Sequence, residues 1–200
     1  AVLIGGGAGT GVLTSAADGI VLIGYTAGAS ITSGNANVAI GYEAMKTHTT
    51  GGNNIAIGYG AMNDTDAGST SLGSESNVFI GGDSGGGTWE DAASRYNIGL
   101  GVATLSDALN GADGNIAVGY QAGRYVTTGD DNVLVGRLAG DAITTESGIV
   151  AIGLGAAGGI STTGDYSIAI GYGAMGGAAL GDGNIAIGYQ SMQNANASGF

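Results

Sequence analysis

The sequence predicts an all-β fold, a solenoid of about eleven coils built as a parallel β-roll or β-helix with 17–18 residues per coil. A six-residue phrase, clearest at 37–42, 54–59 and 184–189, returns eleven times. Its glycines are 17 or 18 residues apart in seven of the ten intervals. In every copy, aliphatic residues stand two apart, as on one face of a strand. The glycines are at positions 5, 24, 41, 58, 81, 101, 119, 136, 153, 171 and 188.

The copies fill the whole chain, so we expect residues 1–200 to form a single β-solenoid repeat domain. Irregular coils are expected at 62–100, where the glycine spacing rises to 23 and then 20. Because the chain starts with an alanine inside a repeat copy, we expect it to be an internal fragment of a longer polypeptide.

Composition restricts the partners and the chemistry. The formal net charge is −12, with only four Lys and Arg residues, so the chain is poorly suited to nucleic acid or to anionic membranes. Cysteine is absent, which excludes disulfides and thiolate metal sites. The apolar runs are far shorter than a membrane span, so we expect no membrane insertion.

Each phrase predicts one short strand. With its glycine as position zero, Val or Ile stands at −3 and Ile, Val or Leu at −1 in all eleven copies. We expect these two residues to face the coil interior and the residue at −2, mostly Ala, to face outward. Since that outward face is also apolar, we expect another copy of the chain to cover it. The structural repeat is clearest at Val38, Ile40, Gly41, Tyr42, Ile55, Ile57, Gly58, Tyr59, Ile116, Val118, Gly119, Tyr120, Ile168, Ile170, Gly171, Tyr172, Ile185, Ile187, Gly188 and Tyr189.

The rest of each coil predicts a corner and a return. Position +3 is always small and position +4 is Gly or Met in nine copies, which predicts a second short strand after the glycine. The return segment carries adjacent hydroxyl residues in five coils, four of them followed by Gly, as in turns. Asn opens seven of the eleven phrases, and we expect these side chains to form hydrogen-bonded ladders along the axis.

These motifs resemble two groups of fibrous proteins. The Asn-Val-Ala-Ile-Gly phrase is similar to the head repeats of trimeric autotransporter adhesins, and the segment from Thr49 to Met62 resembles repeats of phage tail fibres. The resemblance covers nearly the whole chain and implies a homotrimeric, left-handed parallel β-roll in a fibre on a virion or cell surface. Five copies depart from it by lacking the tyrosine, and Ile20 and Ile149 replace the asparagine.

Catalytic and cofactor signatures are missing. His48 is the only histidine, so no serine–histidine–aspartate set can be assembled, and the glycines at 5–9 lack the Lys-Ser/Thr ending of a phosphate loop. We therefore expect no enzyme and no cofactor. Calcium remains possible, because Asp130, Asp131, Asp165 and Asp182 fall in return loops. Adjacent threonines could form an ice-binding array, but neighbours on a strand face opposite sides, which favours a role in turns.

The irregular coils hold the candidates for surface binding. Insertions in solenoids become protruding loops, often on the binding face. Trp89, Arg95 and Tyr96 lie together in one of them, and these residue types are common in binding hot spots. They could contact a glycan or protein on a host cell. The alternative is that Trp89 covers the roll or fills an oligomer interface.

The sequence therefore predicts a structural shaft segment of a viral tail or capsid fibre that supports attachment to a host surface. A bacterial surface adhesin or an extracellular filament is the first alternative. An ice-binding or calcium-binding solenoid is the second.

Overall fold

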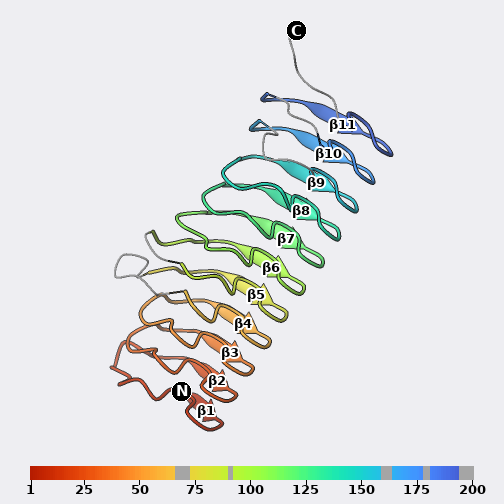
Figure 1. Ribbon diagram of the computed structural model, residues 1–200. Coiled ribbons are helices and arrows are strands. Elements are labelled where there is room, and N and C mark those ends of the chain that lie inside the picture. The colour runs from red at the N-terminus through yellow and green to blue at the C-terminus, as the bar shows by residue number, and fades with distance from the viewer. Residues whose placement is uncertain (66–72, 90–91, 159–163, 178–180, 194–200) are drawn as a thin grey trace.

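The computed structural model describes residues 1–65, 73–89, 92–158, 164–177 and 181–193. Within them lie eleven strands of three residues each and no helix. Figure 1 shows the coils stacked into a rod, with the chain advancing one coil at a time. The strands are β1 (Val2–Ile4), β2 (Val21–Ile23), β3 (Val38–Ile40), β4 (Ile55–Ile57), β5 (Val78–Ile80), β6 (Ile98–Leu100), β7 (Ile116–Val118), β8 (Val133–Val135), β9 (Val150–Ile152), β10 (Ile168–Ile170) and β11 (Ile185–Ile187).

The strands form a single parallel sheet in chain order, β1 to β11. Each strand pairs with its successor in register, so equivalent repeat positions become neighbours, as Val38 does with Ile55 and Ile55 with Val78. The predicted all-β parallel solenoid is confirmed. A rung of the stack corresponds to one repeat, which places chemically equivalent side chains in columns along the rod.

The predicted second strand is wrong in the part of the chain that the structure describes. The residues after each phrase glycine form a tight turn, at the right-hand side of the coils in Figure 1. Glu43 and Met45 have positive φ angles of 57° and 52°, a left-handed conformation that interrupts extended backbone. The turn still bonds to the next coil, since the Met45 N–H donates to the Ala61 carbonyl at 3.0 Å.

The predicted orientation of the strands is also wrong. The central residue of a strand points inward: Ala39 and Ala56 are fully buried, and so is Phe79. The flanking Val38 and Ile40 are only partly buried and face outward. The reason is size, because the coil is narrow beside the strand, where the backbone of the turn lies opposite and a small central residue such as Ala39 fits.

Interior volume is shared between the central strand residue and position +4. In nine of the eleven coils a large residue in the strand is matched by a glycine at +4, as Phe79 is by Gly85, and a small one by Met or Leu, as Ala56 is by Met62. Ala117 with Gly123 and Ala151 with Ala157 are the exceptions. A Cβ on Gly85 would lie 2.8 Å from the Phe79 ring, closer than carbon atoms can approach. The core is therefore filled by different combinations of residues along the rod, and at Gly123 the adjacent space is taken by Leu105 and Leu134 of the neighbouring coils.

The phrase glycines form a column in which no side chain fits. Gly41 has a φ of 142°, and a Cβ added there would lie 2.2 Å from the Gly58 carbonyl oxygen of the next coil. The backbone approaches its neighbour too closely for any other residue. This explains why the glycine is present in all eleven copies.

Candidate functional site

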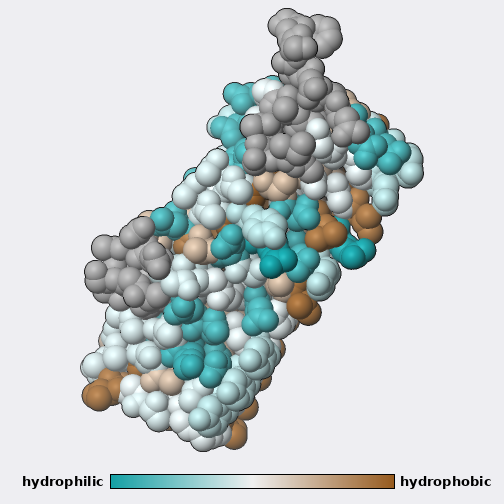
Figure 2. Space-filling view, viewed as in Figure 1, coloured by the Kyte–Doolittle hydropathy of each residue, from teal (hydrophilic) through white to brown (hydrophobic). Residues whose placement is uncertain are grey.

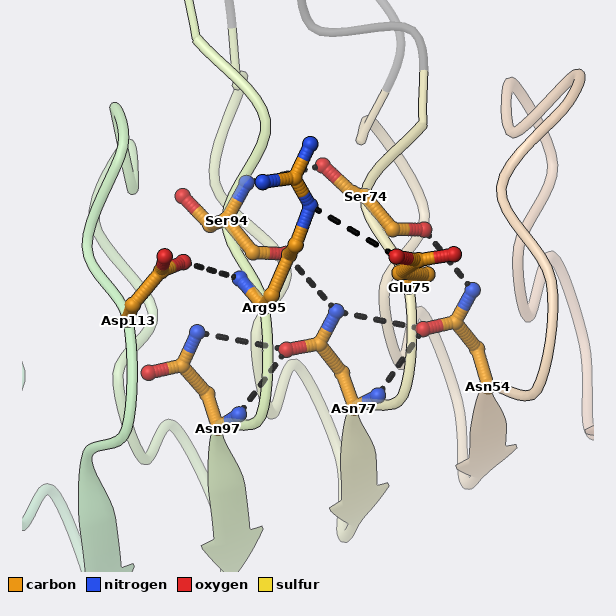
Figure 3. Close-up of polar contacts among 8 residues, drawn as sticks. All are labelled: Asn54, Ser74, Glu75, Asn77, Ser94, Arg95, Asn97 and Asp113. Atoms are coloured by element: carbon orange, nitrogen blue, oxygen red, sulfur yellow. Dashed lines mark hydrogen bonds and ion pairs between the residues drawn. The ribbon is translucent and has the colours of Figure 1, made fainter.

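A buried asparagine ladder runs along the corner before the strands (Figure 3). The Asn77 N–H and side-chain Nδ2 both donate to Asn54 Oδ1, at 3.0 and 3.1 Å, and Asn97 makes the same pair of bonds to Asn77 Oδ1. Each Nδ2 also donates to a carbonyl of a neighbouring coil, as Asn97 does to Ala112 at 2.7 Å. The predicted ladder is confirmed, and it satisfies polar groups inside a core with no water access.

A second ladder, two residues earlier in each coil from Arg95 to Asp182, runs in the opposite sense. The Arg95 N–H donates forward to Asp113 Oδ1 at 2.6 Å, and the Asp113 N–H donates forward to Asp130 Oδ1 at 2.8 Å. In the asparagine ladder, by contrast, each N–H donates backward. Farther along, the Asp165 N–H donates to Asp182 Oδ1 at 3.1 Å.

These bonds bear on the calcium prediction. The carboxylates of Asp130 and Asp182 each have an oxygen engaged by backbone of the preceding coil. Among the residues the structure describes, no group of three or more His, Cys, Asp or Glu is placed to hold a metal ion. Asp113, Asp130, Asp165 and Asp182 therefore act as structural acceptors between coils.

The predicted surface-binding residues do not lie on one surface. Trp89 is fully buried, with its ring edge-on to Phe79 at a centroid distance of 5.9 Å, so it cannot contact a glycan from this position. Its indole Nε1 has no hydrogen-bond partner among the described residues. Tyr96 is 60% exposed, and the partly exposed Arg95 places its Nε 3.8 Å from Glu75 Oε1. Of the three candidates, two remain accessible, while residues 66–72 and 90–91 of the same insertions lie outside the described residues.

A ridge of tyrosines follows the turn after each strand. Tyr25, Tyr42 and Tyr59 stack in succession with centroids 5.3 Å apart, and Tyr172 stacks on Tyr189 at 5.2 Å. All five are exposed. They are five of the six phrase tyrosines at +1, and the sixth, Tyr120, has the Arg137 guanidinium 5.9 Å from its ring centroid.

One charged pair borders this ridge. Glu43 accepts a hydrogen bond from Lys46 at 3.0 Å. The Glu43 charge raises the pKa of Tyr42, and the hydrogen bond to Glu43 raises the pKa of Lys46. Both side chains contact solvent, so this pair contributes little to the fold.

The outward faces of the strands make an apolar surface. The residues at −3 and −1 are Val, Ile or Leu at every rung, and several are exposed, including Ile80, Leu100 and Ile152. Figure 2 shows hydrophobic surface recurring at one coil after another along the right-hand edge of the rod. A face of this regularity is unusual for a surface that meets only water.

The remaining candidates serve the interior. His48 is buried, with Nδ1 2.9 Å from Thr65 Oγ1 and Nε2 2.7 Å from the Gly51 carbonyl oxygen. Thr32 and Thr127 direct their hydroxyls to the carbonyls of Thr49 and Thr144 in the next coils, rather than to a flat outer array. The hydroxyl pair at 162–163 lies outside the described residues.

Neither an enclosed site nor a known relative is found. The described residues line no pocket, and no helix among them has the length and apolarity needed to cross a membrane. No known protein family, curated protein or solved structure matches this chain, so its function has to be inferred from its geometry.

Proposed function

We propose that this chain is a shaft segment of a homotrimeric fibre, of the kind found in viral tails or capsids, and that it supports attachment to a host surface. The observation that carries the proposal is the outward apolar face of the sheet. Eleven in-register rungs present Val, Ile or Leu on both sides of each central residue, outside a coil whose interior is already filled. A second and third copy would cover that face and remove it from water.

The interior supports a mechanical role. Two hydrogen-bonded ladders of opposite sense join successive coils, in addition to the parallel sheet. Such a rod resists bending and unfolding because each rung is held by both neighbours. Its work would be to hold a receptor-binding element away from a surface.

The decisive measurement is the solution mass of the protein with its native flanking segments, by light scattering. A fibre shaft is expected to give three times the 19.1 kDa contribution of this chain. A monomer at micromolar concentration would overturn the trimer.

Outward and inward substitutions distinguish assembly from folding. Val118 and Val135 flank central residues on neighbouring strands and face outward. The double variant Val118→Asp/Val135→Asp should give a monomer that keeps its far-ultraviolet circular dichroism, since the carboxylates would be brought together in a trimer. Val118→Ile/Val135→Ile is the control and should keep the trimer mass.

The inward counterpart is Ala117→Asp, which would bury a charge inside a filled coil. This variant should lose the far-ultraviolet circular dichroism signal of the β-sheet, because the coil can no longer fold. If the outward double variant remained a trimer, the apolar face would not be the interface.

A bacterial surface adhesin or extracellular filament is the second candidate. The exposed Tyr96 and the partly exposed Arg95 support it, since they lie in the irregular coils and could contact a host glycan or protein. Loss of cell-surface binding in Tyr96→Ala, with the mass unchanged, would favour this alternative. An ice-binding role is less well supported, because Thr32 and Thr127 direct their hydroxyls to neighbouring coils, and it would require thermal hysteresis.

A further inference from the structure

The tyrosine ridge is interrupted at the fifth coil. Tyr25, Tyr42 and Tyr59 occupy three successive rungs, and the next two rungs carry Gly82 and Val102 at the same position. The ladder therefore ends on an aromatic ring that faces a rung without a side chain. The same coils carry the long insertions, but the interruption lies in the turn after the strand.

One face of the Tyr59 ring is open. Tyr42 and Tyr59 are within 5° of parallel, so the face of Tyr59 away from Tyr42 is directed along the rod toward Gly82. A Cβ on Gly82 would have only the Tyr59 carbonyl oxygen within reach, at 4.0 Å. Tyr59 is 61% exposed, compared with 45% for Tyr42, which has rings on both sides.

A carboxylate lies beside this opening. Asp83 follows Gly82, and its N–H donates to the Tyr59 carbonyl at 2.8 Å, which fixes the residue at the notch. Its Oδ1 lies over Gly60, where a Cβ would be 2.6 Å away. Asp83 is exposed, and no hydrogen bond to its carboxylate is found in the described part of the chain. The exposed Val102 borders the notch on the following rung.

We propose that this notch, formed by Tyr59, Gly82, Asp83 and Val102, binds a hexopyranose ring of a glycan. A sugar ring has an apolar face of C–H groups that stacks on an aromatic ring, and its hydroxyls donate to a carboxylate. The space of the missing side chain lies at Gly82, and the Asp83 carboxylate lies over Gly60, the residue that follows Tyr59. An aromatic side chain of a protein could also stack there but would leave the Asp83 carboxylate without a donor.

The site adds a ligand to the rod and does not depend on the number of copies in the fibre. It differs from the binding site expected at Arg95 and Tyr96, which precede their strand, whereas the notch follows its strand. A monomer mass would therefore contradict the trimeric shaft but not sugar binding at the notch. An absence of sugar binding would contradict the notch but not the trimer.

The test uses methyl β-D-galactopyranoside, which has a C–H face, and follows the Tyr59 ring resonances by NMR at increasing sugar concentration. One stacked ring should give a Kd on the order of 1 mM, so titration to roughly 100 mM should saturate. Tyr59→Ala and Asp83→Ala, read by saturation transfer to the sugar, should each weaken binding about tenfold or more.

The sharpest variant is Gly82→Tyr. Gly82 is not among the glycines with positive φ, so a tyrosine fits the backbone and would restore the ladder. It should abolish binding while keeping or raising the thermal stability. Tyr25→Ala removes a tyrosine two rungs away and is the matched control, with binding unchanged.

Three results would overturn the proposal. The first is a wild-type protein that shows no saturable change at Tyr59. The second is Gly82→Tyr binding the sugar as well as the wild type does. The third is perturbation of Tyr59 by N-acetyltyrosinamide but not by the galactoside, which would assign the notch to an aromatic protein side chain.

Discussion

The inner and outer faces of the strands follow different rules. On the inside, the central residue ranges from Gly99 to Phe79, and in nine of the eleven coils its size is matched by the residue at position +4. On the outside, the flanking positions hold Val, Ile or Leu at every rung, and no residue of the same coil compensates for them. A position whose residue size varies with that of its neighbour is packed inside the chain. A position that holds the same residue type at every rung is expected to contact a partner that repeats with the same period.

The contrast shows where each face finds its partners. Inside, residue identities vary while buried side chains of the same chain fill the space, either within one coil or, as at Gly123, from Leu105 and Leu134 of the neighbouring coils. Outside, the repeated β-branched shape is what a neighbouring molecule of the same periodicity would require. The experiments below test the inner rule, from the largest expected effect to the smallest.

The largest effect is expected for Phe79→Ala. It removes a buried aromatic ring and its edge contact with Trp89, and should lower the free energy of unfolding by about 3–5 kcal/mol. Thermal and chemical unfolding measure this directly. The double variant Phe79→Ala/Gly85→Met recreates the Ala–Met combination of β3 and β4 and should recover more than about 1 kcal/mol.

Gly85 has a φ of 61° and Met45 one of 52°, so the backbone already accepts a methionine of this conformation elsewhere in the chain. A double variant less stable than Phe79→Ala alone would refute volume sharing within a coil.

A smaller effect is expected for Asn97→Leu, which keeps the interior volume but removes hydrogen bonds. The Ala112 carbonyl and the Asn115 N–H would lose their partners, at a cost of about 2–4 kcal/mol. Chemical unfolding should show the loss at all pH values between 5 and 8. A neutral result would mean that the inner face is specified by volume alone, as the natural Ile149 at the equivalent position suggests for one rung.

The smallest effect concerns Asp141, which lies in a turn between the two faces. Partial burial raises the pKa of its carboxyl above 3.8, opposed by backbone hydrogen bonding and by Arg124. Its Oδ1 has no hydrogen-bond partner in the part of the chain that the structure describes. The folded state therefore keeps the proton to higher pH than the unfolded chain does. The free energy of unfolding falls as the pH rises from the carboxyl pKa of the unfolded chain through the raised pKa of the folded state. Asp141→Asn should be more stable than the wild type at pH 7 by less than about 1 kcal/mol.

The difference should disappear below pH 3.8, where the carboxyl is protonated in both states. Unfolding curves at pH 3 and pH 7 test this. An advantage of the asparagine variant that persisted at pH 3 would assign the effect to packing and not to charge.

The coil stack was predictable because its signal is periodic. The glycine column and the Asn ladder both follow from residues that recur at one position of the repeat, and both are in the structure at that position. The in-register pairing of Val38 with Ile55 follows from the same spacing.

The orientation of the strands was not predicted, for a physical reason. Alternation shows which residues share a face, but not which face is inside. Large aliphatic residues were expected inside, yet a coil this narrow takes Ala39 and leaves Ile40 outside. The opposite variation of sizes at Phe79 and Gly85, and at Ala56 and Met62, was visible in the sequence and would have identified the interior.

The candidate site was predicted only in part. The insertion suggested that Trp89 protrudes, but Leu109 and Ile143 hold apolar side chains at nearly the same place in other coils and are also buried. That recurrence would have placed Trp89 inside. The sequence alone shows that the column of tyrosines is interrupted at Gly82. The structure was needed to show that one face of the Tyr59 ring is open there.

The two ladders of opposite sense have a consequence for how such a protein changes over generations. The bonds of each ladder join equivalent positions, 17 residues apart between Asn37 and Asn54. Deleting or duplicating one such segment of the gene leaves each surviving rung with a neighbour of the same kind. The rod would shorten or lengthen by a single step of about 4.8 Å, so its length can vary by counting repeats and without inventing a new contact.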